Sequence, residues 1–120
     1  TYKHCEGYAA GELKHGPLAL IEKNIPVIAL APYNEHFEKL ISNIEEIKAR
    51  DAKVIILTDK MGAKIIKKRI KKIIIMPETN FLTAPIIYSI PIQLIAYHLA
   101  DYLKTDVDQP RNLAKSVTVE

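Results

Sequence analysis

The end of the chain places one lysine among small and apolar residues, in the run Arg111-Asn112-Leu113-Ala114-Lys115-Ser116-Val117. A desolvated lysine amine can attack a carbonyl carbon and form an imine. At an ordinary lysine pKa of about 10.4, only about one amine in 2,500 is neutral at pH 7, so the reaction needs desolvation or a nearby positive charge. Arg111, four positions earlier, can supply that charge. A solvated lysine near a frayed terminus is the alternative interpretation.

A second reactive candidate lies near the start, in the run Gly11-Glu12-Leu13-Lys14-His15-Gly16-Pro17. The imidazole of His15 can exchange a proton near pH 7 without a large pKa shift, which suits a general acid or base. Glu12 supplies a carboxylate close by in sequence. An ordinary turn histidine beside a glycine and a proline is the alternative.

The other candidate ligands are scattered, and we expect neither a metal nor a cofactor. His4, His36 and His98 have no metal-ligand spacing with one another or with Cys5. Because Cys5 is the only cysteine, it has no internal disulfide partner. We therefore expect the protein to be located in a reducing cytoplasm. No charged and then apolar leader precedes the domain, and the start at Thr1 suggests part of a longer protein.

Length and charge limit the class of protein. With 120 residues, of which 48% are hydrophobic, the chain has enough apolar material for one core and is not expected to be disordered. A net charge of +3 is too small to argue for a nucleic-acid partner by itself, and it also suits a phosphorylated substrate.

The elements that must position these candidates follow an α/β pattern. Continuous apolar runs at 26–31, 54–57 and 73–76 predict strands of a parallel sheet that is buried on both faces. Between the first two, a helix capped by Asn34 is predicted by apolar residues at helical spacing. These residues are Phe37, Leu40, Ile41, Ile44 and Ile47.

A long apolar segment follows the last strand. Residues 85–103 predict a helix with Thr83 near its N-cap and a kink at Pro91. Because prolines and polar residues interrupt 82–100, we expect a buried helix rather than a membrane span, covered by the sheet and by another domain or subunit.

Residues 60–72 concentrate seven basic side chains. We expect a solvated edge. Binding of nucleic acid with a steep salt dependence is the alternative, although no aromatic residue is present in this segment for base stacking.

The two motifs, together with Ala84-Pro85 and the run Gln93-Leu94-Ile95-Ala96-Tyr97-His98, resemble the glutamine–fructose-6-phosphate aminotransferase (isomerizing) family, also called glucosamine-6-phosphate synthases. The resemblance covers essentially the whole chain and is weakest in 60–72. It implies a three-layer α/β/α SIS-type (sugar isomerase) fold with a parallel sheet, of which about three strands are present here. Residues 1–120 would be the C-terminal portion of the second SIS domain, with 104–120 as a tail that covers the active site.

The resemblance also implies roles for single residues. Lys115 would form an imine with open-chain fructose 6-phosphate, and His15 would open the sugar ring in the active site of the neighbouring subunit of a homodimer. The expected substrate-binding residues are Ala114, Arg111 and Glu12.

In such a family, the isomerising glutamate, the phosphate-binding residues and the glutaminase domain lie upstream of the part that this chain resembles. We therefore expect the 120 residues alone to be inactive. The expected partners are fructose 6-phosphate, glucosamine 6-phosphate and the remainder of the synthase. We expect no binding to nucleic acid or to a membrane. A non-catalytic SIS module that binds a sugar phosphate is the alternative function.

Overall fold

The structure is a computed structural model that describes residues 1–109 and 111. It contains two compact units. One comprises Thr1–Cys5 and Ser89–Glu120, and the other comprises Glu6–Tyr88. The second unit holds the sheet and all but one of the helices, and the long last helix runs from this unit into the first.

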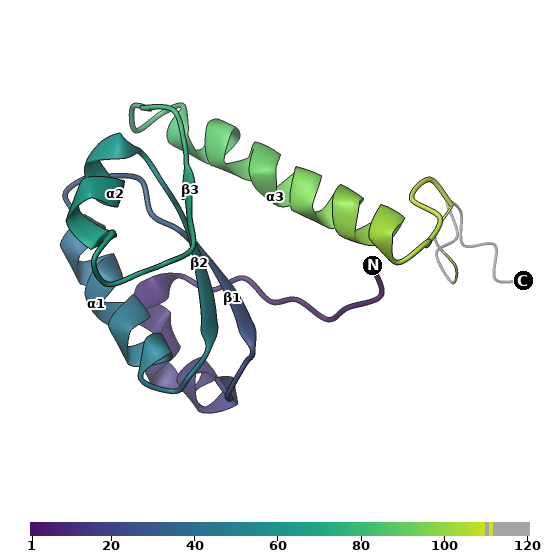
Figure 1. Ribbon diagram of the computed structural model, residues 1–120, viewed down its shortest axis with the longest axis horizontal. Helices are drawn as coiled ribbons and strands as arrows, with labels where there is room; N and C mark the ends of the chain where they lie inside the picture. Colours follow the sequence, from purple (N-terminus) through teal and green to yellow (C-terminus); the bar gives the residue numbers. More distant parts are fainter. Residues whose placement is uncertain (110, 112–120) are drawn as a thin grey trace, which may run out of the picture. The chain divides into compact units, whose positions relative to one another are not determined.

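Three parallel strands form the sheet, in the order β1-β2-β3 (Figure 1). The strands are β1 (Pro26–Leu30), β2 (Lys53–Thr58) and β3 (Ile73–Ile75). Val27 aligns with Val54, and Leu57 aligns with Ile74. The three predicted strands and their parallel direction are confirmed. No strand boundary differs from the prediction by more than one residue.

Burial on both faces holds for the middle strand and fails for both edge strands. Ile56 and Leu57, consecutive residues of β2 that face opposite sides of the sheet, are both fully buried. In β1, by contrast, Ile28 and Leu30 each keep 39% of their surface exposed, whereas Val27 and Ala29 pack against the core. The prediction of two buried faces was wrong for both edge strands, since in β3 Ile74 and Ile75 are likewise 39% and 52% exposed. An apolar run does not report whether its outer face has a partner.

Helix α1 (Phe37–Lys48) follows β1 and buries the predicted apolar stripe. Phe37, Ile41, Ile44 and Ile47 are at most 5% exposed. The predicted N-cap, Asn34, lies two residues before the observed N-cap, His36. Asn34 Oδ1 accepts the N–H of His36 in a turn that precedes the helix, and the helix begins only at Phe37.

A second helix, α2 (Lys60–Ile66), follows β2 and was not predicted. It lies on the same side of the sheet as α1 (Figure 1). Ile66 of α2 and Ile70 beyond it join the core cluster that is formed mainly by α1 and β2. A single hydrophobic core therefore fills the space between the two helices and this face of the sheet.

The last helix, α3 (Ala84–Tyr102), confirms the predicted long helix and continues through Pro91. Thr83 directly precedes the helix, as predicted, and its carbonyl accepts the N–H of Ile87. In the turn before the helix, Asn80 Oδ1 accepts the N–H groups of Leu82 and Thr83. Among the described residues, no helix is long and apolar enough to cross a membrane.

Within the described residues, this helix is buried only in part. Tyr88 and Ala100 are buried, but many large apolar side chains of the segment are exposed. These exposed residues include Ile86, Ile90, Leu94, Tyr97 and Tyr102.

Candidate functional site

The histidine candidate lies at the end of a short helical turn. Helix η1 (Ala10–His15) and helix η2 (Pro17–Leu20) are both 3-10 helices, and Gly16 separates them. Gly16 has a φ of 139°, which side-chain-bearing residues rarely adopt. Pro17 then starts η2 with a suitable φ of its own. The Gly-Pro pair thus gives His15 a defined backbone position at a sharp change of direction.

This turn is attached to the core by apolar and ionic contacts. Leu13 and Leu18 are partly buried and pack against the core cluster. Lys14 Nζ lies 2.9 Å from Glu46 Oε1 of α1, in an ion pair between half-exposed side chains. A half-exposed pair contributes little stability, so the apolar contacts are the main anchor.

Both candidate side chains of the turn face solvent. Glu12 and His15 are exposed, whereas the residues that anchor the turn are not. An exposed imidazole on an anchored backbone can exchange protons with a ligand or act in a neighbouring chain. Neither residue lines the groove between α1 and α2 or the groove near the end of β1.

Of the candidate site residues in the tail, only Arg111 lies within the described residues. The Arg111 guanidinium lies over the ring of Tyr2, 4.3 Å from the ring centre, and the Arg111 N–H donates to the Tyr2 hydroxyl. This cation–π contact ties the tail to the N-terminal segment of the same unit. Lys115 and Ala114 lie outside the described residues.

A buried polar cluster at the carboxyl end of β2 was missed by the sequence analysis. Asp59 is only 7% exposed, and its two carboxylate oxygens accept three backbone N–H groups. Oδ1 accepts from Met61 and Gly62 at 2.9 and 3.0 Å, and Oδ2 accepts from Tyr33 at 2.8 Å. Asp59 therefore caps α2 and holds the loop after β1, and these bonds occupy its oxygens.

The Tyr88 hydroxyl lies near this carboxylate. Burial, and next the negative charge of Asp59, raise the pKa of Tyr88 from 10.0 to about 12. The phenol is therefore neutral at physiological pH. The signal that could have found the cluster is an aspartate directly after a buried strand, followed by Gly62, Ile66 and Ile70 at a spacing of four.

Comparison with known protein families decides what kind of domain this is. The family model of the SIS domain matches residues 1–100. The chain belongs to the SIS domain family.

Several relatives of this SIS domain share one name. A glutamine–fructose-6-phosphate aminotransferase [isomerizing] from Bartonella henselae is 59% identical over all 120 residues, and proteins of the same name from Rhizobium meliloti and Agrobacterium fabrum are 55% and 56% identical. In each case the chain spans only 20% of the relative's length.

A solved structure supports the same fold. The C-terminal domain of glucosamine-fructose-6-phosphate aminotransferase from Francisella tularensis matches with a TM-score of 0.79 and 41% identity. The match covers 90% of this chain and 30% of that one. The SIS-type fold with a parallel sheet is thereby confirmed, and the sheet of this chain is open, with three strands.

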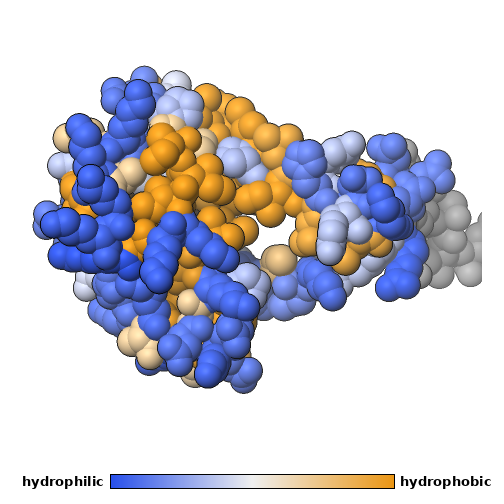
Figure 2. Space-filling model, in the orientation of Figure 1, coloured by the Kyte–Doolittle hydropathy of each residue, from blue (hydrophilic) through white to orange (hydrophobic). Residues whose placement is uncertain are grey.

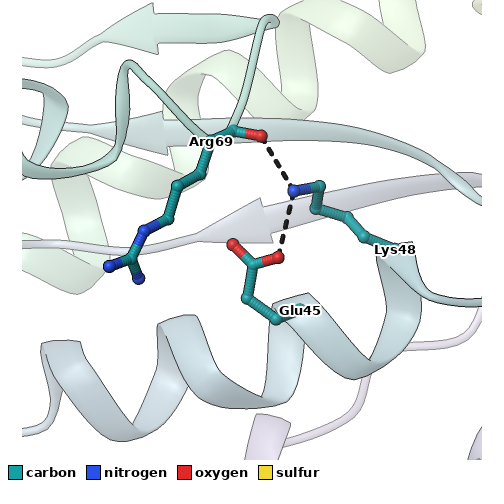
Figure 3. Close-up of polar contacts among 3 residues, drawn as sticks. All are labelled: Glu45, Lys48 and Arg69. Atoms are coloured by element: carbon teal, nitrogen blue, oxygen red, sulfur yellow. Dashed lines mark hydrogen bonds and ion pairs between the residues drawn. The ribbon is translucent and has the colours of Figure 1, made fainter.

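Two grooves of the SIS domain hold none of the candidate residues. A groove of about 430 Å³ between α1 and α2 is lined by side chains that include Ser42, Glu45 and Arg69. Lys48 Nζ donates to Glu45 Oε2 and to the Arg69 carbonyl, at 3.0 and 2.8 Å, and so links two of the lining residues (Figure 3). A smaller groove of about 240 Å³, near the end of β1, is lined mainly by apolar residues.

Metal-ligating residues do not gather in the part of the chain that the structure describes. No group of three or more histidine, cysteine, aspartate or glutamate side chains there is arranged to hold a metal ion.

Proposed function

We propose that this SIS domain is the C-terminal portion of the second SIS domain of a glutamine–fructose-6-phosphate aminotransferase (isomerizing). The observation that carries the proposal is the 59% identity over all 120 residues to a protein of that name. The aligned region includes both ends of the chain and hence both motifs. The reaction converts L-glutamine and D-fructose 6-phosphate into D-glucosamine 6-phosphate and L-glutamate.

The activity belongs to the longer protein, because the chain spans 20% of the length of its relatives. An upstream SIS domain and a glutaminase domain would supply the sugar-phosphate cradle, the isomerising carboxylate and the ammonia. We propose a homodimer in the cytoplasm. The exposed position of His15 at the end of an anchored turn suits a residue that acts in the neighbouring subunit.

The proposed chemistry assigns one step to each reactive residue. His15 exchanges a proton with the ring of fructose 6-phosphate, which opens to the free ketone. The neutral amine of Lys115 then attacks the carbonyl carbon, and a C=N bond replaces the C=O bond as water leaves. Ala114, Arg111 and Glu12 line the substrate.

Substitution of Lys115 by arginine in the full-length protein tests the imine. Arginine keeps the positive charge but cannot provide a neutral amine, so we expect loss of the sugar reaction. Borohydride added with fructose 6-phosphate should trap a reduced sugar adduct on the C-terminal peptide of the wild-type protein, detectable by mass spectrometry. The matched control is Lys104→Arg, because Lys104 is an exposed lysine that pairs loosely with Asp101 at 3.8 Å.

Two results would contradict the assignment. Near-normal turnover of Lys115→Arg without any adduct would remove Lys115 from the chemistry. Tight sugar-phosphate binding without turnover or adduct in the wild-type protein would instead identify a SIS module that only binds.

A further inference from the structure

The basic segment 60–72 forms an unusual surface of this domain. Seven of the 17 basic residues lie in it and no acidic residue does, so the ten basic residues elsewhere are outnumbered by fourteen acidic ones. The net positive charge of the chain therefore comes from this one segment. The basic residues are Lys60, Lys64, Lys67, Lys68, Arg69, Lys71 and Lys72.

The fold turns every one of these charges outward. Gly62, Ile66 and Ile70, spaced by four residues, are buried against the core. All seven basic residues between and around them are exposed. Hydrophilic side chains accordingly cover the part of the molecule where α1 and α2 lie (Figure 2).

These cations form no ion pair within the described residues, and only Arg69 lines a groove together with glutamates, namely Glu38 and Glu45. Within the described residues, the ion pairs join other side chains, such as Lys14 with Glu46 and Lys48 with Glu45, and none involves a basic residue of 60–72. A cluster of like charges without internal partners destabilises the fold through electrostatic repulsion. Binding of an external anion would reduce this repulsion.

Two exposed apolar side chains favour an anionic bilayer over a nucleic acid as the binding partner. Met61 and Ile65, one turn apart on α2, are 45% and 49% exposed, and Ile65 also lines the groove between α1 and α2. A nucleic-acid backbone offers these side chains no partner, and the segment has no aromatic residue for base stacking. Clustered lysines with apolar tips suit the interface of an anionic bilayer.

We propose that the face formed by residues 60–72 binds the surface of an anionic lipid membrane peripherally. The lysines contact the phosphate headgroups, and Met61 and Ile65 reach into the interface. Because α2 has only seven residues, the attraction is mainly electrostatic. The proposal replaces two expectations from the sequence, that the segment is a merely solvated edge and that no membrane is a partner. It does not depend on the proposed enzymatic activity.

Vesicle sedimentation of the natural full-length protein tests the proposal. We expect partitioning onto vesicles of phosphatidylcholine with about one third phosphatidylglycerol, and none onto pure phosphatidylcholine. Raising the salt from about 0.1 M to about 0.5 M should release the protein, because screening shortens the range of the attraction.

Charge removal at two matched sets of sites locates the surface. A protein with Lys64→Gln, Lys67→Gln, Lys68→Gln and Lys71→Gln should bind at least on the order of 100-fold more weakly. A control with four other exposed lysines changed, Lys3→Gln, Lys23→Gln, Lys39→Gln and Lys53→Gln, should keep most of the binding. Absence of wild-type binding, or equal losses in the two sets, would overturn the proposal.

The apolar pair separates lipid from nucleic acid. Met61→Ser with Ile65→Ser should weaken vesicle binding by about tenfold. Unchanged vesicle binding in this variant, or tighter binding of the wild-type protein to duplex DNA than to vesicles, would remove the reason for preferring a membrane and would overturn the proposal.

Discussion

At the scale of single residues, His15 shows how a backbone can present a reactive side chain without burying it. Gly16 adopts a conformation that only glycine tolerates well, and Pro17 starts the next turn. Leu13 and Leu18 hold the turn on the core. The backbone of His15 is thereby held in place, while its imidazole ring is exposed to solvent.

The substitution His15→Asn tests the assigned proton exchange. Asparagine can hydrogen-bond but cannot exchange a proton near neutral pH, so we expect turnover of fructose 6-phosphate by the full-length protein to fall by about 10²- to 10⁴-fold. The matched control is His36→Asn, because His36 is an exposed histidine beside Glu35 and is far from the motif in sequence. Equal turnover of both variants would return His15 to the role of an ordinary turn residue.

At the scale of elements, the junction between β2 and α2 is closely packed. Asp59 uses both of its oxygens to cap α2 and to hold the loop after β1. Gly62 sits in the first turn of α2, where a Cβ would lie 2.1 Å from Thr58 Oγ1 and 2.8 Å from the Phe37 ring. The helix approaches the sheet this closely only because residue 62 has no side chain.

Gly62→Ala should therefore destabilise the domain by about 1–3 kcal/mol, the usual cost of overpacking a filled core. Thermal or urea unfolding of the full-length protein measures the change. Gly7→Ala is the control, since a Cβ at Gly7 meets nothing within 4 Å. A Gly62→Ala variant as stable as the control would show that α2 can shift without cost.

At the scale of the whole molecule, the chain exposes more apolar surface than a finished domain needs. Phe81 and Tyr102 are 89% and 80% exposed, and further large apolar side chains of α3 are exposed as well. Apolar surface of this extent marks places where other protein packs. The relatives are five times as long as the region they share with this chain, which is consistent with a domain that is completed by further residues.

Residues 1–120 expressed alone should accordingly form no glucosamine 6-phosphate. The physical reason is that the proposed phosphate cradle and the isomerising carboxylate belong to the upstream region. A product assay with fructose 6-phosphate and ammonia tests this directly, with the full-length protein as the positive control. Product formation by the 120 residues would place the whole isomerising centre within this chain.

The sequence by itself determined the type and order of the main elements. Apolar runs and helical spacing depend on neighbouring residues only, and they correctly predicted three strands, α1 and α3. The motifs around His15 and Lys115 were also readable directly, because each is a contiguous run of residues.

Tertiary structure alone decided which faces of these elements are covered. The basic composition of 60–72 hid α2, whose existence depends on the Asp59 cap and on packing of Ile66 and Ile70 against α1 and β2. The same applies to β1 and α3, which are equally apolar in sequence whether or not a partner lies against them. Burial is a relation between segments far apart in the chain, so a local pattern can suggest which face seeks a partner but not whether one is present.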